Sequence, residues 1–270
     1  METLRKHIAI YCVNYHSYDS LNNYLASIDQ AVQKSKNDIE LTVFVADNSV
    51  PAQPIPFHSE LFMLHLLQTG QNLGYFGAVK HLMEHYPPTC YDYAIISNAD
   101  VVIPDDFFGK LSKTAFPQHT GWIAPQIFSR QEQRDRNPKI LQRYPKKKLQ
   151  ILKCLFTVPP LYNLYTHTAY KSKKFIHHQP GQIYAGHGSF IILTNEYFQR
   201  CGIIDYPVFL FCEEIYLAEQ CLQQNLRVLY CPELCIHDAE HASTSNMRRS
   251  RYCQLNKQAI THILNTYYNS

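Results

Sequence analysis

The sequence predicts an α/β fold in which a mostly parallel central sheet is flanked by helices. Two observations predict it: short apolar runs of the kind that form strands buried on both faces, and segments of helical apolar spacing that separate those runs. Alternating strands and helices build a parallel, doubly wound sheet, and such sheets bind ligands at the carboxyl ends of their strands. The 270 residues are enough for one large domain, and no linker divides the chain.

The first half of the chain supplies the alternation. Its expected strands are HIAIYCV (7–13), LTVFVAD (41–47), FMLHLLQ (62–68) and YDYAIIS (91–97). A helix is expected after the first strand, because five apolar residues share one helical face there: Leu21, Tyr24, Leu25, Ile28 and Val32. A second helix is expected over GYFGAVKHLMEHY (74–86).

The second half begins less regularly. From 130 to 182 prolines occur and no clean periodicity predicts an element. A strand is expected over GSFIILT (188–194), followed by a short helix (195–202) that Asn195 would cap and Gly202 would end. The remaining expected elements are a helix (209–225), a strand (226–237) and an amphipathic C-terminal helix (247–268).

Positive charge is concentrated in one segment. Residues 130–174 hold 12 Lys or Arg against Glu132 and Asp135, a net charge of +10, whereas 13 basic and 20 acidic residues elsewhere give −7. A solvated insertion would explain this charge, and a surface that meets anionic lipid or an anionic acceptor would explain it equally. Nucleic acid is a weaker third explanation, because no nucleic-acid motif accompanies the charge.

The cysteines and apolar runs bear on cellular location. The nine cysteines form no C-x-x-C pair, and most lie inside apolar runs, which is typical of reduced, cytosolic thiols. The N-terminal apolar run is too short for a signal peptide, and no run approaches the roughly 18 apolar residues of a spanning helix. We therefore expect a cytoplasmic protein. If 130–174 binds anionic lipid, the protein would be peripheral on the inner face of the plasma membrane.

Six stretches of the chain, in this order, resemble one family. They are VNYHSYDSLNNYLASI, VADNS, NLGYFGAVKHLM, IISNADVVIPDD, GHGSFIILTNEYFQRCGIID and FLFCEEIYLAEQCLQQNLRVLYCPELCIH. They resemble family 2 glycosyltransferases, especially the rhamnosyltransferase-like branch of bacterial surface-polysaccharide enzymes. The resemblance implies the glycosyltransferase A fold, a Rossmann-like fold of nucleotide-diphospho-sugar transferases. It also implies inverting transfer of a sugar from a nucleotide-sugar donor to a saccharide or lipid-linked acceptor, with a divalent metal.

Inverting transfer needs the residue types that these stretches contain. The acceptor hydroxyl must lose a proton, which requires a carboxylate base. The nucleoside diphosphate leaves with added negative charge, which a cation must stabilise. Hard oxygen ligands such as Asp suit Mg²⁺ or Mn²⁺.

The resemblance assigns the donor site to residues that follow strands of the first half. Asp47 matches the acid whose carboxylate accepts the N3–H of uracil or thymine, which favours a UDP or dTDP donor; an Asx-turn cap is the alternative. Tyr15 matches a position near the base. Asn72 and Gly74 match an N-x-G turn, in which glycine lets the backbone approach the nucleotide.

The metal site is expected around Asn98 and Asp100, which match the family's D-x-D element with Asn in the first place. We expect Asp100 to bind the metal and Asn98 to make a ribose or orienting hydrogen bond; a plain Asn-x-Asp turn is the alternative. His237 matches the histidine that closes this site. A zinc site is a weaker alternative, because no second ligand pair stands at finger spacing. It would use Cys231, Cys235, His237 and His241.

The base and the acceptor side are expected in the second half. Glu213 and Glu214 match paired acids whose second member is the catalytic base, so Glu214 is the expected base. Adjacent helical residues point about 100° apart, so only one of the two can face the acceptor. Acids also favour the first turn of a helix through its dipole, and this is the alternative. His187, Gly188 and Ser189 lie where the family lines the acceptor side.

Residues 1–270 would then form one glycosyltransferase domain. It would comprise a nucleotide-sugar half (1–125), a basic insertion (126–182), an acceptor and catalytic half (183–245) and a C-terminal helix (246–270). Two other functions stay open. A nucleotidyltransferase of related fold would need a glycine- and arginine-rich loop after the first strand, where this chain has VNYHSYDS. A degenerate sugar-nucleotide-binding protein would explain Asn98 and Glu214 in place of Asp.

Overall fold

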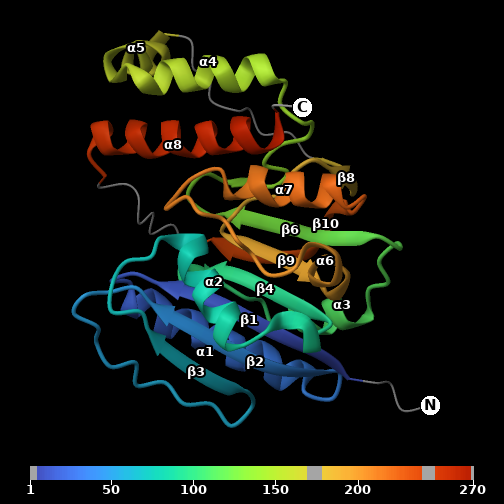
Figure 1. The fold of residues 1–270 in the computed structure, drawn as a ribbon. Coiled ribbons are helices and arrows are strands. Elements are labelled where there is room, and N and C mark those ends of the chain that lie inside the picture. The colour runs from blue at the N-terminus through green and yellow to red at the C-terminus, as the bar shows by residue number, and fades with distance from the viewer. Residues whose placement is uncertain (1–4, 169–177, 239–246, 269–270) are drawn as a thin grey trace.

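The computed structural model describes residues 5–168, 178–238 and 247–268, which fold around one ten-stranded sheet (Figure 1). The strands are β1 (Lys6–Asn14), β2 (Ile39–Asp47), β3 (Met63–Gln68), β4 (Tyr93–Asn98), β5 (Val101–Val102), β6 (Thr120–Ser129), β7 (Arg134–Asp135), β8 (Gly181–Ile183), β9 (Phe190–Thr194) and β10 (Arg227–Asp238). The α-helices are α1 (Tyr18–Ser35), α2 (Tyr75–His85), α3 (Phe107–Lys113), α4 (Lys146–Thr157), α5 (Pro159–Thr168), α6 (Asn195–Cys201), α7 (Glu213–Gln223) and α8 (Arg249–Tyr267). The strand order is β3-β2-β1-β4-β9-β6-β10-β5, with β7 beside β6 and β8 beside β10.

Strand direction brings the strand ends to a common edge. β3, β2, β1 and β4 are parallel neighbours, and β6 and β10 are parallel to each other. β9 lies between these two groups and pairs antiparallel with both β4 and β6, so the six strands of the two groups point the same way. The predicted mostly parallel sheet is confirmed, and the carboxyl ends of its parallel strands lie at one edge.

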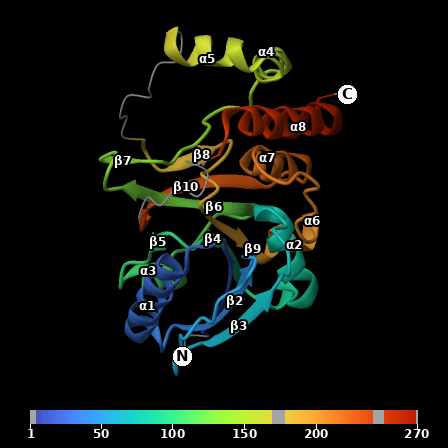
Figure 2. The ribbon, with the colours of Figure 1, turned by 90° about the vertical axis from the view of Figure 1, so that its left-hand side faces the viewer.

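Helices cover both faces of the sheet (Figure 2). α1 and α3 bury one face, with side chains such as Leu25 and Phe107. α2, α6 and α7 bury the other, with Phe76, Tyr197 and Leu217 in the core. α8 packs on α7, and α4 and α5 pack on α8 as an outer layer (Figure 1). In the described part of the chain, no helix is long and apolar enough to cross a membrane.

The predicted strands and most predicted helices are confirmed in place, but the prediction lacks β6, a long central strand. Pro125 interrupts the apolar run of β6 and has no N–H to donate to the sheet. In the structure Pro125 lies opposite Cys231, where the register between β6 and β10 shifts. The missing donor therefore falls at a bulge, which tolerates it.

Two helix starts differ from the prediction. Thr194 caps α6 in place of the asparagine after it, because its hydroxyl accepts a backbone N–H of the first turn. α7 begins at Glu213 rather than at Phe209, since Phe211 (φ 77°) and Cys212 (φ 64°) have left-handed backbone conformations that a helix cannot contain. Both predicted acids therefore lie in the first turn of α7.

The segment 130–182 is regular over much of its described length, contrary to the prediction. β7 pairs with the end of β6, and α4 and α5 pack against α8. Leu149 and Phe156 of α4 are buried, whereas Ile151 of the same helix and Val158 directly after it are exposed. Apolar residues on both faces of α4 conceal the single stripe by which an amphipathic helix is recognised.

An ion pair with a buried carboxylate anchors this segment to the core. Arg143 donates to both oxygens of Glu219, at 2.7 and 3.0 Å, and to the carbonyl of Tyr267 at 3.0 Å. Glu219 is 1% exposed and also accepts from the Tyr184 hydroxyl at 2.6 Å. Several donors thus compensate the buried carboxylate, and removal of Arg143 would leave a buried charge without its main partner.

A close contact at Gly74 joins the two halves of the chain. Gly74 has a left-handed backbone (φ 77°), and a Cβ there would lie 2.0 Å from the carbonyl oxygen of Phe209. Two asparagines hold the turn: Asn48 Nδ2 donates to the Gly74 carbonyl, and the Gly74 N–H donates to Asn72 Oδ1, both at 2.9 Å. Glycine is the only residue that fits this position without strain or overlap.

Gly74→Ala is expected to destabilise the protein by more than about 2 kcal/mol, because it adds backbone strain and an overlap with Phe209. Gly70→Ala is the matched control: Gly70 also has a positive φ (69°), but no atom lies within 4 Å of its Cβ position. Denaturant unfolding of both variants measures the difference. Equal losses would show that the Phe209 contact is unimportant.

Candidate active site

Asp47, predicted from the second strand, lies at the carboxyl edge of the sheet next to a polar residue of the first strand. The register of β1 and β2 puts Asn14 beside Asp47. The Asp47 carboxylate is 3% exposed and accepts from Asn14 Nδ2 at 3.0 Å, the Tyr18 hydroxyl at 2.8 Å and the Ser49 N–H at 3.1 Å. Asp47 thus orders the loops that follow both strands, as an Asx-type cap would. Its role toward a pyrimidine base stays a prediction.

Asn48 connects Asp47 to the turn at Asn72 and Gly74. Its Nδ2 reaches the Gly74 carbonyl and lies 3.5 Å from Asn72 Oδ1. Its own Oδ1 is buried and has no hydrogen-bond partner among the described residues. Tyr15 lies at the same strand end and is 44% exposed. Asn48, which the prediction lacked, therefore joins the ends of β1 and β2 to the predicted turn at Asn72 and Gly74.

A short strand brings Asp100 to the end of β10. β5 follows Asp100 directly and pairs antiparallel with β10, so that Val101 lies opposite Asp238. Burial and the negative charge of Asp238 raise the pKa of Asp100 to about 6, against the opposing effects of a hydrogen bond from Asn98 and the charge of Arg136. Two carboxylates from distant parts of the chain thus share a partly buried site, which disfavours their joint ionisation.

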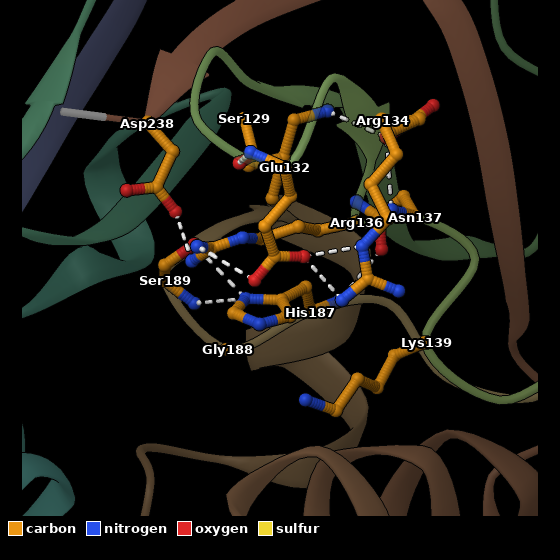
Figure 3. Close-up of polar contacts among 12 residues, drawn as sticks. Ser129, Glu132, Arg134, Arg136, Asn137, Lys139, His187, Gly188, Ser189 and Asp238 are labelled. Carbon is orange, nitrogen blue, oxygen red and sulfur yellow. Dashed lines mark hydrogen bonds and ion pairs between the residues drawn. The ribbon is translucent and has the colours of Figure 1, made fainter. Parts of the chain in front are cut away.

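Arg136 partly compensates this negative charge. It lies between two carboxylates: its Nη1 donates to Oδ2 of Asp238, and its Nη2 is 3.6 Å from Oε1 of Glu132 (Figure 3). Glu132 also pairs with Arg134 of β7. Asp238 is 4% exposed, so its pairing with Arg136 is largely removed from water. These arginines belong to the predicted basic insertion, whose first residues therefore line the site.

His237 lies one residue before Asp238, so its side chain projects from the opposite face of β10. Its ring packs edge-on against Phe128, with a centroid distance of 6.3 Å. Its Nδ1 is buried without a hydrogen-bond partner among the described residues, and burial lowers its pKa. The next residue, Asp238, is the one whose charge raises the pKa of Asp100. A metal-binding role for His237 stays a prediction.

The donor atoms at Asp100 fit a divalent cation. Carboxylate oxygens are the ligands that Mg²⁺ and Mn²⁺ prefer, and a cation would relieve the repulsion between Asp100 and Asp238. Within the described ranges, no group of three or more His, Cys, Asp or Glu side chains could hold a metal, so a bound ion would need further oxygens from its substrate. The zinc alternative is not assembled there either. Cys231 donates instead to Glu233 at 3.3 Å, and His241 lies outside the described residues.

The paired acids of α7 have different environments. Glu213 is 7% exposed, and its Oε1 accepts the backbone N–H of Phe211 at 2.9 Å. Burial and the nearby Glu214 raise the pKa of Glu213. The Glu214 side chain is 18% exposed; its Oε1 accepts the Gly188 N–H at 3.3 Å and lies 3.9 Å from Lys139 Nζ. Glu214 is thus the member of the pair that faces the predicted acceptor residues.

His187, Gly188 and Ser189 form a fixed turn before β9. The His187 N–H donates to Asn137 Oδ1 at 2.7 Å, and the Ser189 N–H donates to His187 Nδ1 at 3.2 Å. The Gly188 carbonyl accepts from the Tyr75 hydroxyl at 2.9 Å. A Cβ on Gly188 would lie 3.2 Å from Glu214 Oε1, so a larger residue would crowd the carboxylate.

Asn48, Arg136, Lys139 and Asp238 are among the residues of this edge that were not predicted. Asn48 and Asp238 stand next to predicted residues, and their strand-end positions were an available signal. Arg136 and Lys139 had no such signal, because they follow β6, which the prediction lacks. Their positions depend on pairings between strands far apart in the sequence.

Comparisons with known proteins show the fold. No protein-family model matches the chain, and no curated protein matches its sequence. The mannosyltransferase PcManGT from Pyrobaculum calidifontis, solved with GDP-Man and Mn²⁺, is 14% identical with a TM-score of 0.54 over 98% of this chain and 72% of that chain. Residues 1–349 of TarS from S. aureus are 8% identical with a TM-score of 0.54 over 96% and 72%.

A third structure, GalNAc-T7 with UDP, GalNAc and Mn²⁺, is 10% identical with a TM-score of 0.59. The match covers 98% of this chain but 49% of that one, so this chain spans about half of its length. At such low identity the comparisons concern architecture alone. The chain has the glycosyltransferase A fold.

Glu213→Gln is expected to flatten the dependence of stability on pH. Because the pKa of Glu213 is raised, the folded protein keeps a proton that the unfolded chain releases above the ordinary glutamate pKa, so this group lowers stability as pH rises from about 5. A neutral glutamine removes that loss. Thermal unfolding across this range measures it, with the exposed Glu60→Gln as the control. The same pH slope in Glu213→Gln and wild type would contradict the assignment.

Proposed function

We propose that this protein is an inverting, metal-dependent glycosyltransferase. It moves a sugar from a UDP- or dTDP-sugar to a saccharide or lipid-linked acceptor in surface polysaccharide or lipopolysaccharide biosynthesis. The observation that carries the proposal is one edge of a glycosyltransferase A sheet that holds both Asp100 beside Asp238 and Glu214 beside Gly188. The nucleotides and Mn²⁺ in the structures of PcManGT and GalNAc-T7 support a nucleotide-sugar donor and a divalent metal.

Glu214 is the catalytic base in this proposal. The acceptor hydroxyl attacks the anomeric carbon of the donor sugar, a C–O bond forms, and the bond to the diphosphate oxygen breaks. Glu214 accepts the hydroxyl proton. The Gly188 N–H orients the carboxylate, and Lys139 Nζ lies 3.9 Å from it. Glu213 is a poor base here, because it is buried and bonded to the backbone of its own loop.

Asp100 and Asp238 would hold the divalent ion, with His237 as the further predicted ligand. When bound, Mg²⁺ or Mn²⁺ supplies positive charge against the diphosphate leaving group. Arg136 holds Asp238 in place from the side of β7, and Asn98 hydrogen-bonds to Asp100. These contacts fix both carboxylates before a substrate arrives, which is the preorganisation that charge stabilisation requires.

The donor base is proposed to lie over Asp47 and Tyr15, between the ends of β1 and β2. Asp47 would accept an imide N–H, which uracil and thymine have and adenine and cytosine lack. Asn72 and Gly74 would present backbone to the nucleotide. The enzyme would work in the cytoplasm, and its basic segment, 130–174, would meet either an anionic acceptor or an anionic membrane.

A nucleotidyltransferase stays the second candidate, and a degenerate sugar-nucleotide-binding protein the third. The position of Glu214 against Gly188, on the side of the predicted acceptor residues, supports the transferase over the degenerate protein. Hydrolysis or transfer of a UDP- or dTDP-sugar in the presence of Mn²⁺ separates the transferase from the degenerate binding protein.

Glu214→Gln is expected to lower transfer by at least about a hundredfold and to leave donor affinity unchanged, because it keeps the shape of the side chain and removes its basicity. Glu213→Gln should retain most of the activity. Initial rates with the donor and calorimetric donor affinities measure both. An inactive Glu213→Gln beside an active Glu214→Gln would reverse the two roles.

Asp100→Asn is expected to abolish the increase in UDP or dTDP affinity that Mn²⁺ causes, and Asp238→Asn is expected to do the same. His237→Ala should weaken that increase if His237 is a ligand. Calorimetry of each variant, with and without Mn²⁺, makes the comparison. Wild-type nucleotide affinity that does not depend on metal would contradict the metal site, and an unaltered Asp100→Asn would reduce Asp100 to a turn residue.

A further inference from the structure

The outer layer of the molecule, α4 with α5 on α8, has an apolar surface that no part of the described chain covers. Ile151, Val158 and Leu161 are 52%, 47% and 44% exposed. Ile151 and the exposed Cys154 lie three residues apart on α4, Val158 lies in the extended link after it, and Leu161 lies on α5. These four side chains are called the apolar stripe. Four of the nine exposed large apolar side chains in the described chain fall between Leu141 and Leu161.

Burial within the protein does not explain these residues. The core-facing side of α4 is occupied by Leu149 and Phe156, which are 1% and 8% exposed, and Phe156 packs against Tyr252 of α8. α4 therefore has already buried one apolar face. A second, solvent-facing apolar stripe costs hydration free energy and indicates a partner outside the chain.

The charge around this stripe has one sign. Within their printed bounds α4, α5 and α8 contain no Asp or Glu. Lys146 and Lys147 are exposed at the start of α4, where cations oppose the helix dipole at a local cost. At the other end of the layer, Arg249 of α8 lies over the ring of Tyr162 of α5, 5.4 Å from its centroid. The apolar stripe is thus bordered by cations at both ends.

We infer that this layer docks on the surface of an anionic lipid bilayer. An exposed apolar stripe bordered by Lys and Arg is the pattern of helices that lie in a membrane interface, with apolar side chains among the acyl chains and cations at the headgroups. α4 has 12 residues and is about 18 Å long, so it lies along a membrane rather than across it. A second copy of this layer is an unsuitable partner, because two acid-free cationic surfaces repel each other.

The layer is packed against the acceptor side of the candidate site. Tyr252 of α8 contacts Phe156 and Tyr162 in the layer, and it contacts Phe211 at a centroid distance of 5.0 Å. Phe211 in turn donates its N–H to Glu213, the neighbour of the proposed base. Docking through α4 would therefore hold the acceptor side next to the bilayer. This choice of a lipid-linked acceptor, unlike the docking itself, rests on the proposed function.

The test is flotation of the purified protein with vesicles of phosphatidylcholine, with and without phosphatidylglycerol, in the absence of nucleotide and metal. Wild-type protein should bind vesicles that contain phosphatidylglycerol and release them as salt is raised. Lys146→Gln with Lys147→Gln should weaken binding roughly thirtyfold, since each Lys contributes about 1 kcal/mol at such a surface. Ile151→Gln with Val158→Gln should weaken it at every salt concentration, because it removes the inserted side chains.

Matched controls lie on other surfaces. Lys34→Gln with Lys36→Gln removes the same charge from the end of α1, and Leu66→Gln with Leu222→Gln replaces equally exposed apolar side chains, 45% and 51% exposed. Both should bind vesicles as the wild type does. Thermal unfolding and nucleotide affinity of every variant separate loss of docking from loss of fold or of the donor site.

Three results would overturn the inference. They are absence of wild-type binding to phosphatidylglycerol vesicles, equal losses in the control variants, and conversion of a dimer to a monomer by the Ile151 and Val158 substitutions, which would identify the stripe as a self-interface. Because the assay needs no turnover, an inactive protein that binds vesicles refutes the proposed function and leaves the docking intact.

Discussion

The antiparallel pairing of β5 with the end of β10 is the contact on which the candidate site depends. It closes a crossover between residues 137 positions apart in the chain and puts Asp238 next to Asp100. Two carboxylates in a partly buried place repel each other, so the site needs positive charge to be stable. Arg136 supplies part of that charge from the turn after β7, which itself pairs with β6. The order of strands β6, β10 and β5 thus determines which charges meet.

The strand ends were predictable from the sequence, and the contacts between them were not. Periodicity and composition act within an element, and they placed Asp47, Asp100 and the paired glutamates at element termini correctly. Which ends become neighbours depends on strand order and register, and these are set by core packing over the whole chain. Asp238 illustrates the limit. It stands beside the predicted His237, but the two side chains point to opposite faces of β10, and only the register with β5 identifies the one near Asp100.

The sequence prediction missed elements whose residues are unfavourable for their own secondary structure. β6 contains Pro125, which is unfavourable in a central strand until the bulge opposite it is known. α4 has apolar residues on both faces and lysines at the wrong end for the helix dipole. In β6 the compensation is internal, since β10 provides the bulge. No described part of the chain covers Ile151 of α4 or Val158 after it. These exposed side chains therefore indicate a partner outside the chain.

The two sides of the site are built from different parts of the fold, and this separation suits a transferase. Donor-side residues stand on β1, β2 and β4, whose ends are joined by short contacts such as the one from Asn14 to Asp47. The acceptor side rests on a strained loop, in which left-handed Phe211 and Cys212 turn the chain into α7. Phe211 binds Glu213 through its N–H and packs on Tyr252, so Glu213 is used to hold the loop and Glu214 is left facing Gly188. Tyr252 belongs to α8. The orientation of Glu214, the proposed base, therefore depends on the same outer layer of α4, α5 and α8 that exposes Ile151. A force on that layer would therefore reach the acceptor side first, because the donor side is held by its own strand ends and meets this loop at Gly74.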